Sequence, residues 1–371
     1  MYTTIAITSN TSWYLYNFRK NTIIALINKG YKVVAISPYD DYSNKLISLG
    51  VVYIDIDIDN GGTNPFRDLK TLFSFYAIFS KINVDVVLNF TPKNNIYSTM
   101  AAFMNGAKVI NNVAGLGVLF INEGIASKIA RTLYKFSQKF ANKIFFQNED
   151  DRNLFLENGM ASQSITDRLP GSGVDLSRFE VMQPKDDGKV RFLLIARMLY
   201  DKGVQHYVEA ARILKKQYGD IVEFRLLGFL DVDNPSAVTK DEMDKWTSEG
   251  VVSYLGTSDQ VEVEIAQVDC VVLPSFYREG VPKSLLEAGA MGKIIVTTDN
   301  VGCRETVDHD VNGYICEPRS TVSLKVMLEK VINLTYEDRI KMGKKSREKM
   351  ENKFDEKIVI QKYLSAIDEL I

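Results

Sequence analysis

The chain carries one pattern of alternating elements twice. Short apolar runs typical of strands alternate with helix-length segments, first near residues 4–8, 32–37, 51–58, 84–90, 107–113 and 142–147. The same alternation restarts at residues 190–195 and continues near 222–227, 251–255, 269–273 and 294–297 before the chain ends in helices. Strands that alternate with helices build βαβ units around a parallel sheet. The sequence therefore predicts an α/β chain of two Rossmann-like domains.

Length and turn residues place the boundary between these domains. The chain has 371 residues, of which 46% are hydrophobic, and this is enough for two cores. A turn-rich stretch at residues 170–173 and a polar loop at residues 184–188 separate the two series of strands. We expect one domain over residues 1–175, a second over residues 176–353, and a last helix within residues 354–371.

Composition excludes several classes of protein. The net charge is −2, which gives no reason to expect a nucleic-acid partner. Three cysteines without metal-ligand spacing predict a reducing compartment and no disulfide framework. The N-terminus has no leader pattern, and no apolar run approaches the roughly 20 residues that span a bilayer. We therefore expect a cytoplasmic protein with no membrane span.

The segment from Ser275 to Glu287 predicts an anion site. The apolar run at residues 269–273 reads as a buried strand that Pro274 ends, and a loop with Glu279 and Gly280 follows. Pro282 suits the first position of a helix, so the helix should begin near residue 282. Its first backbone N–H groups, at residues 280–284, would then bind an anion such as a phosphate.

Three polar side chains share one face of this expected helix. Lys283 and Glu287 are four residues apart, and Ser284 and Glu287 are three apart, so they project from neighbouring turns. Glu287 could bind two vicinal hydroxyls such as those of a ribose, while Glu279 binds hydroxyls on the far side of the phosphates. A sugar nucleotide presents its groups in that order.

The two glutamates and the residues between them resemble a known motif. Glutamate, seven residues and glutamate, with Gly280-Val281-Pro282 after the first, looks like the donor motif of retaining glycosyltransferases of family four. Arg197 and Lys202, after the strand at residues 190–195, look like the family's diphosphate-binding pair, and residues 227–231, with Gly228, resemble another landmark. Two cations placed just after a strand suit a diphosphate.

The resemblance implies a fold, a donor and a set of roles. The fold would be GT-B, in which two Rossmann-like domains face each other and the last helix returns to the first domain. The donor would be a UDP-sugar bound by residues 176–353, with retention at the anomeric carbon and no required metal. The implied catalytic residues are Arg197, Lys202 and Glu279, and the implied donor-binding set adds Gly228, Gly280, Val281, Pro282, Lys283, Ser284 and Glu287.

The N-terminal half resembles a narrower group within that family. Residues 91–97 and 111–117 look like segments of bacterial members that extend polyprenyl-diphosphate-linked saccharides in polysaccharide or glycan assembly. Residues 1–175 would then bind this acceptor, through Trp13, Tyr16, Asn17, Arg19, Lys93, Asn94, Gly115 and Gly117. A plain core role for the aromatic residues is an equal alternative, because such rings mostly fill cores.

A run of basic residues suggests a membrane contact. Its members recur every three or four positions and are Lys128, Arg131, Lys135, Lys139 and Lys143. That spacing places them on one face of a helix beside an apolar face, and five cations would attract an anionic leaflet. The alternative is an ordinary solvated helix face. The first interpretation predicts a peripheral protein on the inner face of the cytoplasmic membrane.

The sequence thus predicts a glycosyltransferase that moves a hexose or N-acetylhexosamine from a UDP-sugar to a polyprenyl-diphosphate-linked saccharide. Two alternatives stay open, a UDP-sugar epimerase of the same architecture and a non-catalytic sugar-nucleotide-binding subunit. A nicotinamide-dependent dehydrogenase is disfavoured, because no glycine-rich dinucleotide fingerprint follows the first strand of either half. No histidine lies between residues 1 and 205, so a histidine base is excluded there.

Overall fold

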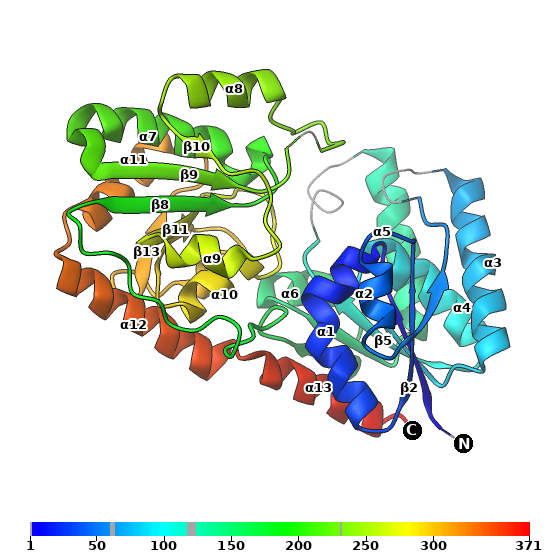
Figure 1. The fold of residues 1–371 in the computed structure, drawn as a ribbon. Coiled ribbons are helices and arrows are strands. Elements are labelled where there is room, and N and C mark those ends of the chain that lie inside the picture. The colour runs from blue at the N-terminus through cyan, green and yellow to red at the C-terminus, as the bar shows by residue number, and fades with distance from the viewer. Residues whose placement is uncertain (1, 60–63, 117–123, 231) are drawn as a thin grey trace. The chain divides into compact units, whose positions relative to one another are not determined.

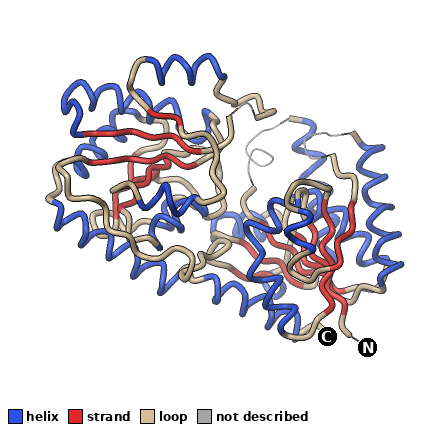
Figure 2. The backbone as a smooth tube through the Cα atoms, in the orientation of Figure 1, coloured by secondary structure: helices blue, strands red, loops and turns tan. Residues whose placement is uncertain are grey.

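The computed structural model describes residues 2–59, 64–116, 124–230 and 232–371. The chain forms two compact units (Figures 1 and 2). Unit 1 comprises Met1–Ser172 and Lys357–Ile371, and unit 2 comprises Gly173–Glu356. None of the helices in the described ranges is long and apolar enough to cross a membrane.

Unit 1 is built around a parallel sheet with the strand order β3-β2-β1-β4-β5-β6-β7. The strands are β1 (Thr4–Thr8), β2 (Lys32–Ser37), β3 (Val52–Asp55), β4 (Val86–Asn89), β5 (Lys108–Val113), β6 (Lys143–Phe146) and β7 (Thr166–Arg168). The central strand β1 is buried along its whole length, and its Ala6 pairs with Val34 of β2 on one side and Val87 of β4 on the other. Burial on both faces explains the continuous apolar runs in these strands.

Helices cover both faces of this sheet. They are α1 (Ser12–Asn28), α2 (Ser43–Ile47), α3 (Pro65–Ile82), α4 (Thr99–Met104), α5 (Ile125–Ser137), α6 (Glu149–Glu157) and α13 (Glu356–Asp368), with a π-helix η1 (Asn94–Ser98) and 3₁₀ turns η3 (Gln138–Phe140) and η4 (Gln163–Ile165). One core lies under α3 to α6, and the other lies under α1, α2 and α13. The last helix adds Val359, Tyr363 and Ile367 to the second core, so it is an integral part of unit 1.

Unit 2 repeats the architecture with the strand order β10-β9-β8-β11-β12-β13, again all parallel. The strands are β8 (Val190–Ile195), β9 (Val222–Leu227), β10 (Ser253–Tyr254), β11 (Cys270–Leu273), β12 (Ile294–Thr298) and β13 (Gly313–Cys316). The helices are α7 (Val204–Tyr218), α8 (Lys240–Ser248), α9 (Val261–Ala266), α10 (Lys283–Ala290), α11 (Thr321–Ile332) and α12 (Tyr336–Lys353), with 3₁₀ turns η5 (Tyr200–Lys202), η6 (Gly219–Ile221) and η7 (Arg304–Thr306).

The predicted α/β class with two Rossmann-like domains is confirmed. Every predicted strand run contains a strand, although β3 ends at Asp55, within the expected run at residues 51–58. Two edge strands were not predicted. β7 reads Thr-Asp-Arg and has no apolar signal, whereas β13 reads Gly-Tyr-Ile-Cys, which is mostly apolar but only four residues long.

Candidate functional site

The predicted donor motif lies on the loop between β11 and α10 in unit 2 and continues into α10. Cys270–Leu273 forms the buried strand β11, as its apolar run predicts, and the chain continues through Pro274 and Ser275 without regular structure. The helix α10 begins at Lys283, one residue later than expected. Pro282 is the N-cap, with ψ at 121°, and does not occupy the first helical position. The first N–H groups of α10 still follow this loop directly, as an anion site requires.

An ion pair joins two of the three predicted catalytic residues. The Lys202 ammonium at the end of η5 contacts the Glu279 carboxylate, and both side chains are largely buried. The Ser275 hydroxyl donates to the same carboxylate oxygen over 2.9 Å. The Lys202 ammonium also lies 4.9 Å from the centre of the Tyr277 ring. The sequence therefore placed Lys202 and Glu279 in one site correctly, but it gave no sign that they pair.

Backbone contacts fix the loop that carries Glu279. The carbonyl of Asp201 accepts hydrogen bonds from the N–H groups of Phe276 and Tyr277, over 3.0 and 3.1 Å. The Asn300 side chain donates to the Tyr277 carbonyl over 2.6 Å. The loop after β11 is thus tied to the segment after β8 on one side and to the segment after β12 on the other.

Close backbone approach at this edge of the sheet requires glycine at three positions. A Cβ atom on Gly203 would lie 2.1 Å from the Pro274 carbonyl oxygen, and one on Gly228 would lie 1.8 Å from that of Ala196. A Cβ atom on Gly302 would lie 1.4 Å from the carbonyl oxygen of Gly280, inside the donor motif itself. All three residues have positive φ, a conformation that side chains rarely adopt.

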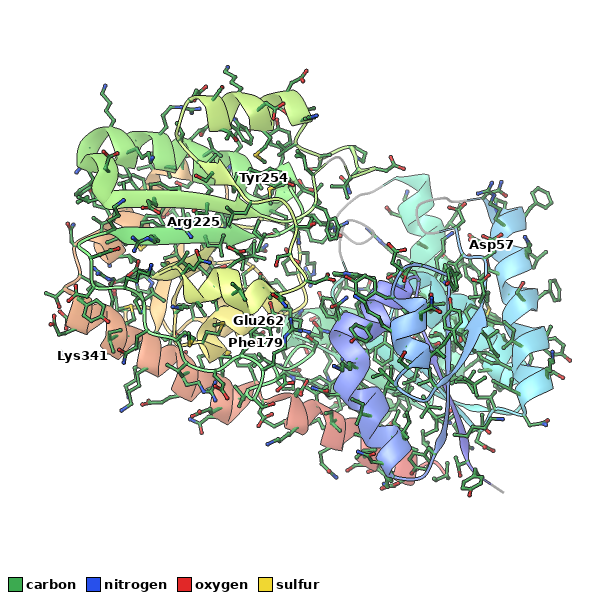
Figure 3. All side chains as sticks on the ribbon, in the orientation of Figure 1. Asp57, Phe179, Arg225, Tyr254, Glu262 and Lys341 are labelled. Atoms are coloured by element: carbon green, nitrogen blue, oxygen red, sulfur yellow. The ribbon has the colours of Figure 1, made fainter. Side chains whose placement is uncertain are left out.

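Glu287 lies inside unit 2 with two basic neighbours. Its side chain is buried, and desolvation raises its pKa to about 7, against the opposing effects of Lys283 and Arg178. The Lys283 ammonium lies 4.0 Å from the Glu287 carboxylate, which confirms that the two share a helix face. Arg178 pairs with Glu262 of α9 over 2.8 Å, and Figure 3 labels Glu262. Neither Arg178 nor Glu262 was predicted, because nothing in the sequence links them to α10.

The remaining donor residues lie where the carboxyl ends of the strands meet. Arg197 is exposed and follows β8, and Gly228 follows β9 directly. Gly280 and Val281 are buried, and Pro282 and Ser284 are partly exposed. Ligands of open parallel sheets bind at the carboxyl ends of the strands. The predicted donor residues therefore share one edge of the sheet in unit 2.

The predicted acceptor residues of α1 are less accessible. Trp13, Tyr16 and Asn17 are half-buried, and the Asn17 amide donates to the Trp13 carbonyl over 3.0 Å. Arg19 is only 1% exposed, and its guanidinium lies 4.4 Å from the centre of the Phe90 ring. The prediction that Arg19 meets an acceptor diphosphate is therefore wrong, because the side chain packs inside unit 1.

Three other predicted acceptor residues lie in the segments that follow β4 and β5. Lys93 pairs with Asp68 of α3 over 2.6 Å, and Asn94 is fully buried. Gly115 has φ at 115° in the segment after β5. Gly117 lies outside the described residues.

Buried amides form a network under these residues. Thr8, Asn89 and Asn111 join the ends of β1, β4 and β5 through hydrogen bonds of 2.6 and 2.9 Å. The carbonyl of Asn95, in the π-helix η1, accepts from Gln138 over 2.8 Å, and the buried Oδ1 and Nδ2 atoms of Asn112 have no hydrogen-bond partner in the part of the chain that the structure describes. π-Helical turns occur often at functional sites. This network, which the sequence did not reveal, gives unit 1 a polar end at its central strands.

The predicted basic helix is shorter than expected. α5 ends at Ser137, so Lys139 lies in the turn η3 and Lys143 begins β6. Lys143 pairs in the sheet with Ile110 and lines a cavity of about 620 Å³ between β6, β7 and α13. The prediction of one face with five cations is therefore wrong for Lys143, because sheet pairing requires an extended backbone there. Lys128, Arg131 and Lys135 lie on α5 as predicted.

Both histidines make structural contacts. His206 Nδ1 lies 2.8 Å from the Thr321 hydroxyl, and His309 Nδ1 accepts from the Ile315 N–H over 2.9 Å. No cluster of three or more histidine, cysteine, aspartate or glutamate residues is placed to hold a metal ion within the described ranges.

Comparisons with known proteins identify the family. Residues 178–349 match the model for glycosyl transferases group 1, and residues 4–148 match the glycosyl transferase 4-like model. The chain is 31% identical over 377 residues to the N,N'-diacetylbacillosaminyl-diphospho-undecaprenol alpha-1,3-N-acetylgalactosaminyltransferase of Campylobacter jejuni, covering 96% of each chain. The chain therefore belongs to the same glycosyltransferase family as this relative.

Two further comparisons support the assignment and the fold. The glycosyltransferase is 25% identical over 316 residues to the UDP-Gal:alpha-D-GlcNAc-diphosphoundecaprenol alpha-1,3-galactosyltransferase of Escherichia coli, covering 78% of this chain and 76% of that one. Its structure matches that of Anabaena HepE in complex with UDP-glucose, with a TM-score of 0.80, 15% identity and 99% of each chain covered. The predicted GT-B fold and the predicted enzyme class are both confirmed.

Proposed function

We propose that this glycosyltransferase moves a hexosyl or N-acetylhexosaminyl group from a UDP-sugar to a polyprenyl-diphosphate-linked saccharide, with retention at the anomeric carbon. The observation that carries the proposal is the paired Lys202 and Glu279 beside α10, at the edge of the sheet that also carries Arg197. The names of two relatives specify undecaprenyl-diphosphate-linked acceptors, and one of them specifies UDP-Gal. Both names specify α linkages, which fit retention because ordinary UDP-hexoses are α-linked.

The ion pair suggests how the donor is recognised. The donor diphosphate competes with Glu279 for the Lys202 ammonium, because phosphate oxygens and carboxylates bind the same cation. As Lys202 turns to the diphosphate, Glu279 becomes available to accept hydrogen bonds from hydroxyls of the transferred sugar. Glu287 and Lys283, 4.0 Å apart on α10, bind the nucleoside part of the donor. One exchange of partners thereby couples donor binding to sugar positioning.

The same groups account for catalysis. The bond between the anomeric carbon and the diphosphate oxygen breaks, the acceptor hydroxyl oxygen forms the new bond to that carbon, and the hydroxyl proton is released. The leaving UDP gains negative charge in this step, and Arg197, Lys202 and the first N–H groups of α10 stabilise it. Because two cations and a helix N-terminus supply this positive charge, we propose that no metal is required. Chelation with EDTA should leave turnover unchanged.

The decisive experiment measures product formation from a panel of UDP-sugars, with and without a short-chain polyprenyl-diphosphate-linked sugar. We expect acceptor-dependent lipid product from one UDP-sugar, with UDP-GalNAc and UDP-Gal tested first because the names of the relatives contain these sugars. Arg197→Ala and Glu279→Gln should each lower kcat/KM by at least about a hundredfold. Lys216→Ala, which changes an exposed cation of α7 in the same unit, should leave it unchanged.

The two alternatives give different results in this assay. An epimerase would convert the UDP-sugar without any acceptor, and its product would be another UDP-sugar. A non-catalytic subunit would bind the donor without releasing UDP under any condition. Either outcome would contradict the proposed transfer.

A further inference from the structure

The helix α3 has a second apolar face that no described residue covers. Its inner face packs Thr71, Phe75 and Phe79 into unit 1. Its outer face exposes Phe66, Leu69, Phe73 and Tyr76, with 82%, 50%, 55% and 39% of each residue accessible. These four positions follow a spacing of three, four and three residues, so they form one stripe along the helix. A surface helix of a globular protein normally carries polar residues there.

The stripe continues onto the neighbouring elements. The Asn105 amide, just after α4, donates to the Tyr76 carbonyl over 3.3 Å, which brings the end of α4 to the end of the stripe. Phe103 of α4 is exposed and stacks on Phe140 of η3 at 4.3 Å, and Phe136 of α5 meets Phe140 at 5.3 Å. We call this surface the apolar band, which consists of Phe66, Leu69, Phe73, Tyr76, Phe103, Met104, Ile129 and Phe136. Figure 1 shows α3, α4 and α5 together on one side of unit 1.

Basic side chains accompany the apolar band. Lys128 and Lys135 of α5 and Lys139 of η3 are exposed, and the sequence from residue 125 to residue 140 contains no aspartate or glutamate. The outer side of α3 adds Lys81, which is also exposed. Arg67 and Lys70 of α3 pair with Asp59 and Asp57 over 3.5 and 3.0 Å, so they add little net charge. Figure 3 labels Asp57 next to α3.

We infer that the apolar band is a docking surface for an anionic phospholipid bilayer, in which α3 lies in the interface and inserts its aromatic stripe. Exposed Phe, Tyr and Leu next to lysines match the composition of helices that lie in the plane of a membrane. An isologous contact between two copies would bring two surfaces that both carry Lys128, Lys135 and Lys139 into one interface, so charge disfavours a second copy as the occupant. Apolar patches of this extent mark interaction sites on soluble proteins.

The proposed membrane contact is centred on α3, whereas the sequence predicted one centred on the basic residues from Lys128 to Lys143. The lysines of α5 attract the anionic bilayer, but the side chains that insert into it belong to α3. The sequence did not indicate this role for α3. This contact stands independently of the proposed function, because vesicles without donor or acceptor test it. Failure of vesicle binding would leave the sugar-transfer assay in detergent unaffected.

The test is co-sedimentation of the full chain with vesicles of phosphatidylglycerol and phosphatidylcholine, compared with phosphatidylcholine alone. We expect binding to the anionic vesicles, weakened by salt because the attraction is partly electrostatic. Phe66→Ser with Phe73→Ser should weaken it by at least about tenfold, because two large apolar side chains no longer insert. Val322→Ser with Val326→Ser is the matched control, since it removes two exposed apolar residues of α11 in unit 2.

A second pair of variants tests the charge. Lys128→Glu with Lys139→Glu should weaken binding by at least about tenfold, because each cation near an anionic surface contributes a factor of about five. Lys216→Glu with Lys344→Glu makes the same change at exposed sites of unit 2 and should leave binding unchanged. Circular dichroism and thermal unfolding check that every variant is folded.

The depth to which α3 inserts into the bilayer is measured with the Phe73→Trp variant and vesicles of brominated phosphatidylglycerol. The bromine atoms quench the fluorescence of an inserted indole. Quenching of the added fluorescence, over that of Trp13 and Trp246, would support insertion. Equal binding of the wild type and the Phe66→Ser, Phe73→Ser variant would overturn the inference. So would a wild-type dimer that this variant converts to a monomer, because the band would then be an interface between copies.

Discussion

Burial changes the acidity of Glu287 in the middle of α10. Desolvation raises its pKa to about 7, well above the ordinary value near 4.5, and Lys283 and Arg178 only partly oppose the shift. The folded chain therefore holds this proton more strongly than the unfolded chain does. Between about pH 4.5 and 7 the folded state binds more protons, so the free energy of unfolding falls as the pH rises through this window. Above the folded pKa the loss is complete.

Replacing Glu287 with Gln should remove this part of the pH dependence. Urea unfolding of wild type and Glu287→Gln from pH 5 to 8 should show a smaller decline in the variant, by roughly 2–3 kcal/mol across the window. Glu180→Gln, at an exposed position, is the control and should follow the wild type. If the free energy of unfolding fell equally with pH in Glu287→Gln and Glu180→Gln, burial of the Glu287 carboxyl would not cause the pH dependence of stability. We also expect Glu287→Gln to bind the donor more weakly, because a carboxylate accepts stronger hydrogen bonds from hydroxyls than an amide does.

Gly302 offers a second test at single-residue scale. Its φ is +80°, and an added Cβ would meet the Gly280 carbonyl oxygen at 1.4 Å, so the Glu279 loop would have to move. We expect Gly302→Ala to lower kcat/KM by at least about tenfold, because small displacements of positioning groups are costly. Gly250→Ala is the matched control, since Gly250 has φ at +69° but open space around an added Cβ. It should cost about 1 kcal/mol of stability and leave activity unchanged.

At the scale of elements, α1 and α13 meet around a buried arginine. The Arg19 guanidinium is surrounded by Tyr14, Phe90 and Tyr363, at 5.7, 4.4 and 5.9 Å from the ring centres. It donates to the Tyr14 hydroxyl over 3.1 Å. Its Nε and Nη1 atoms have no hydrogen-bond partner among the described residues. Arg19 therefore contributes mainly as a large side chain whose charge interacts with aromatic faces.

We expect Arg19→Met to fold with a stability within about 1.5 kcal/mol of the wild type, because it preserves volume and removes a buried charge. Arg19→Ala should cost roughly 2–5 kcal/mol, since it leaves a cavity between α1, β4 and α13. Chemical unfolding measures both. Activity with the lipid acceptor should survive in Arg19→Met. A folded Arg19→Met variant that had lost acceptor binding would restore the discarded role at the acceptor diphosphate.

The sequence predicted those elements whose signal is local. Strand β11 is apolar throughout and β8 is apolar except at Arg191, and proline followed by a helical run located α10 to within one residue. The secondary structure of Lys143 and the burial of Arg19 depend instead on contacts with segments distant in the sequence. The helical spacing of three or four residues continues through Lys143, but pairing with β5 makes it a strand residue. Arg19 looks like a surface cation until α13, more than 300 residues later, covers it.

At the scale of the whole molecule, the predicted donor and acceptor residues lie in different units. Each has its own parallel sheet and its own cores, so each is organised independently. Every predicted donor residue, from Arg197 to Glu287, belongs to unit 2. The predicted acceptor residues and the apolar band belong to unit 1. This division predicts that a nucleotide alone acts on one unit.

UDP should therefore protect unit 2 selectively. A ligand that binds only the folded state stabilises it by about 2.7 kcal/mol at a hundred times its Kd. Amide hydrogen exchange with saturating UDP should slow at η5, at residues 275–282 and in α10, while β1, α1 and α13 of unit 1 change little. Arg197→Ala should abolish the effect, and Lys216→Ala should preserve it. Protection confined to unit 1 would place the nucleotide in the wrong unit and would contradict the assignment of the donor site.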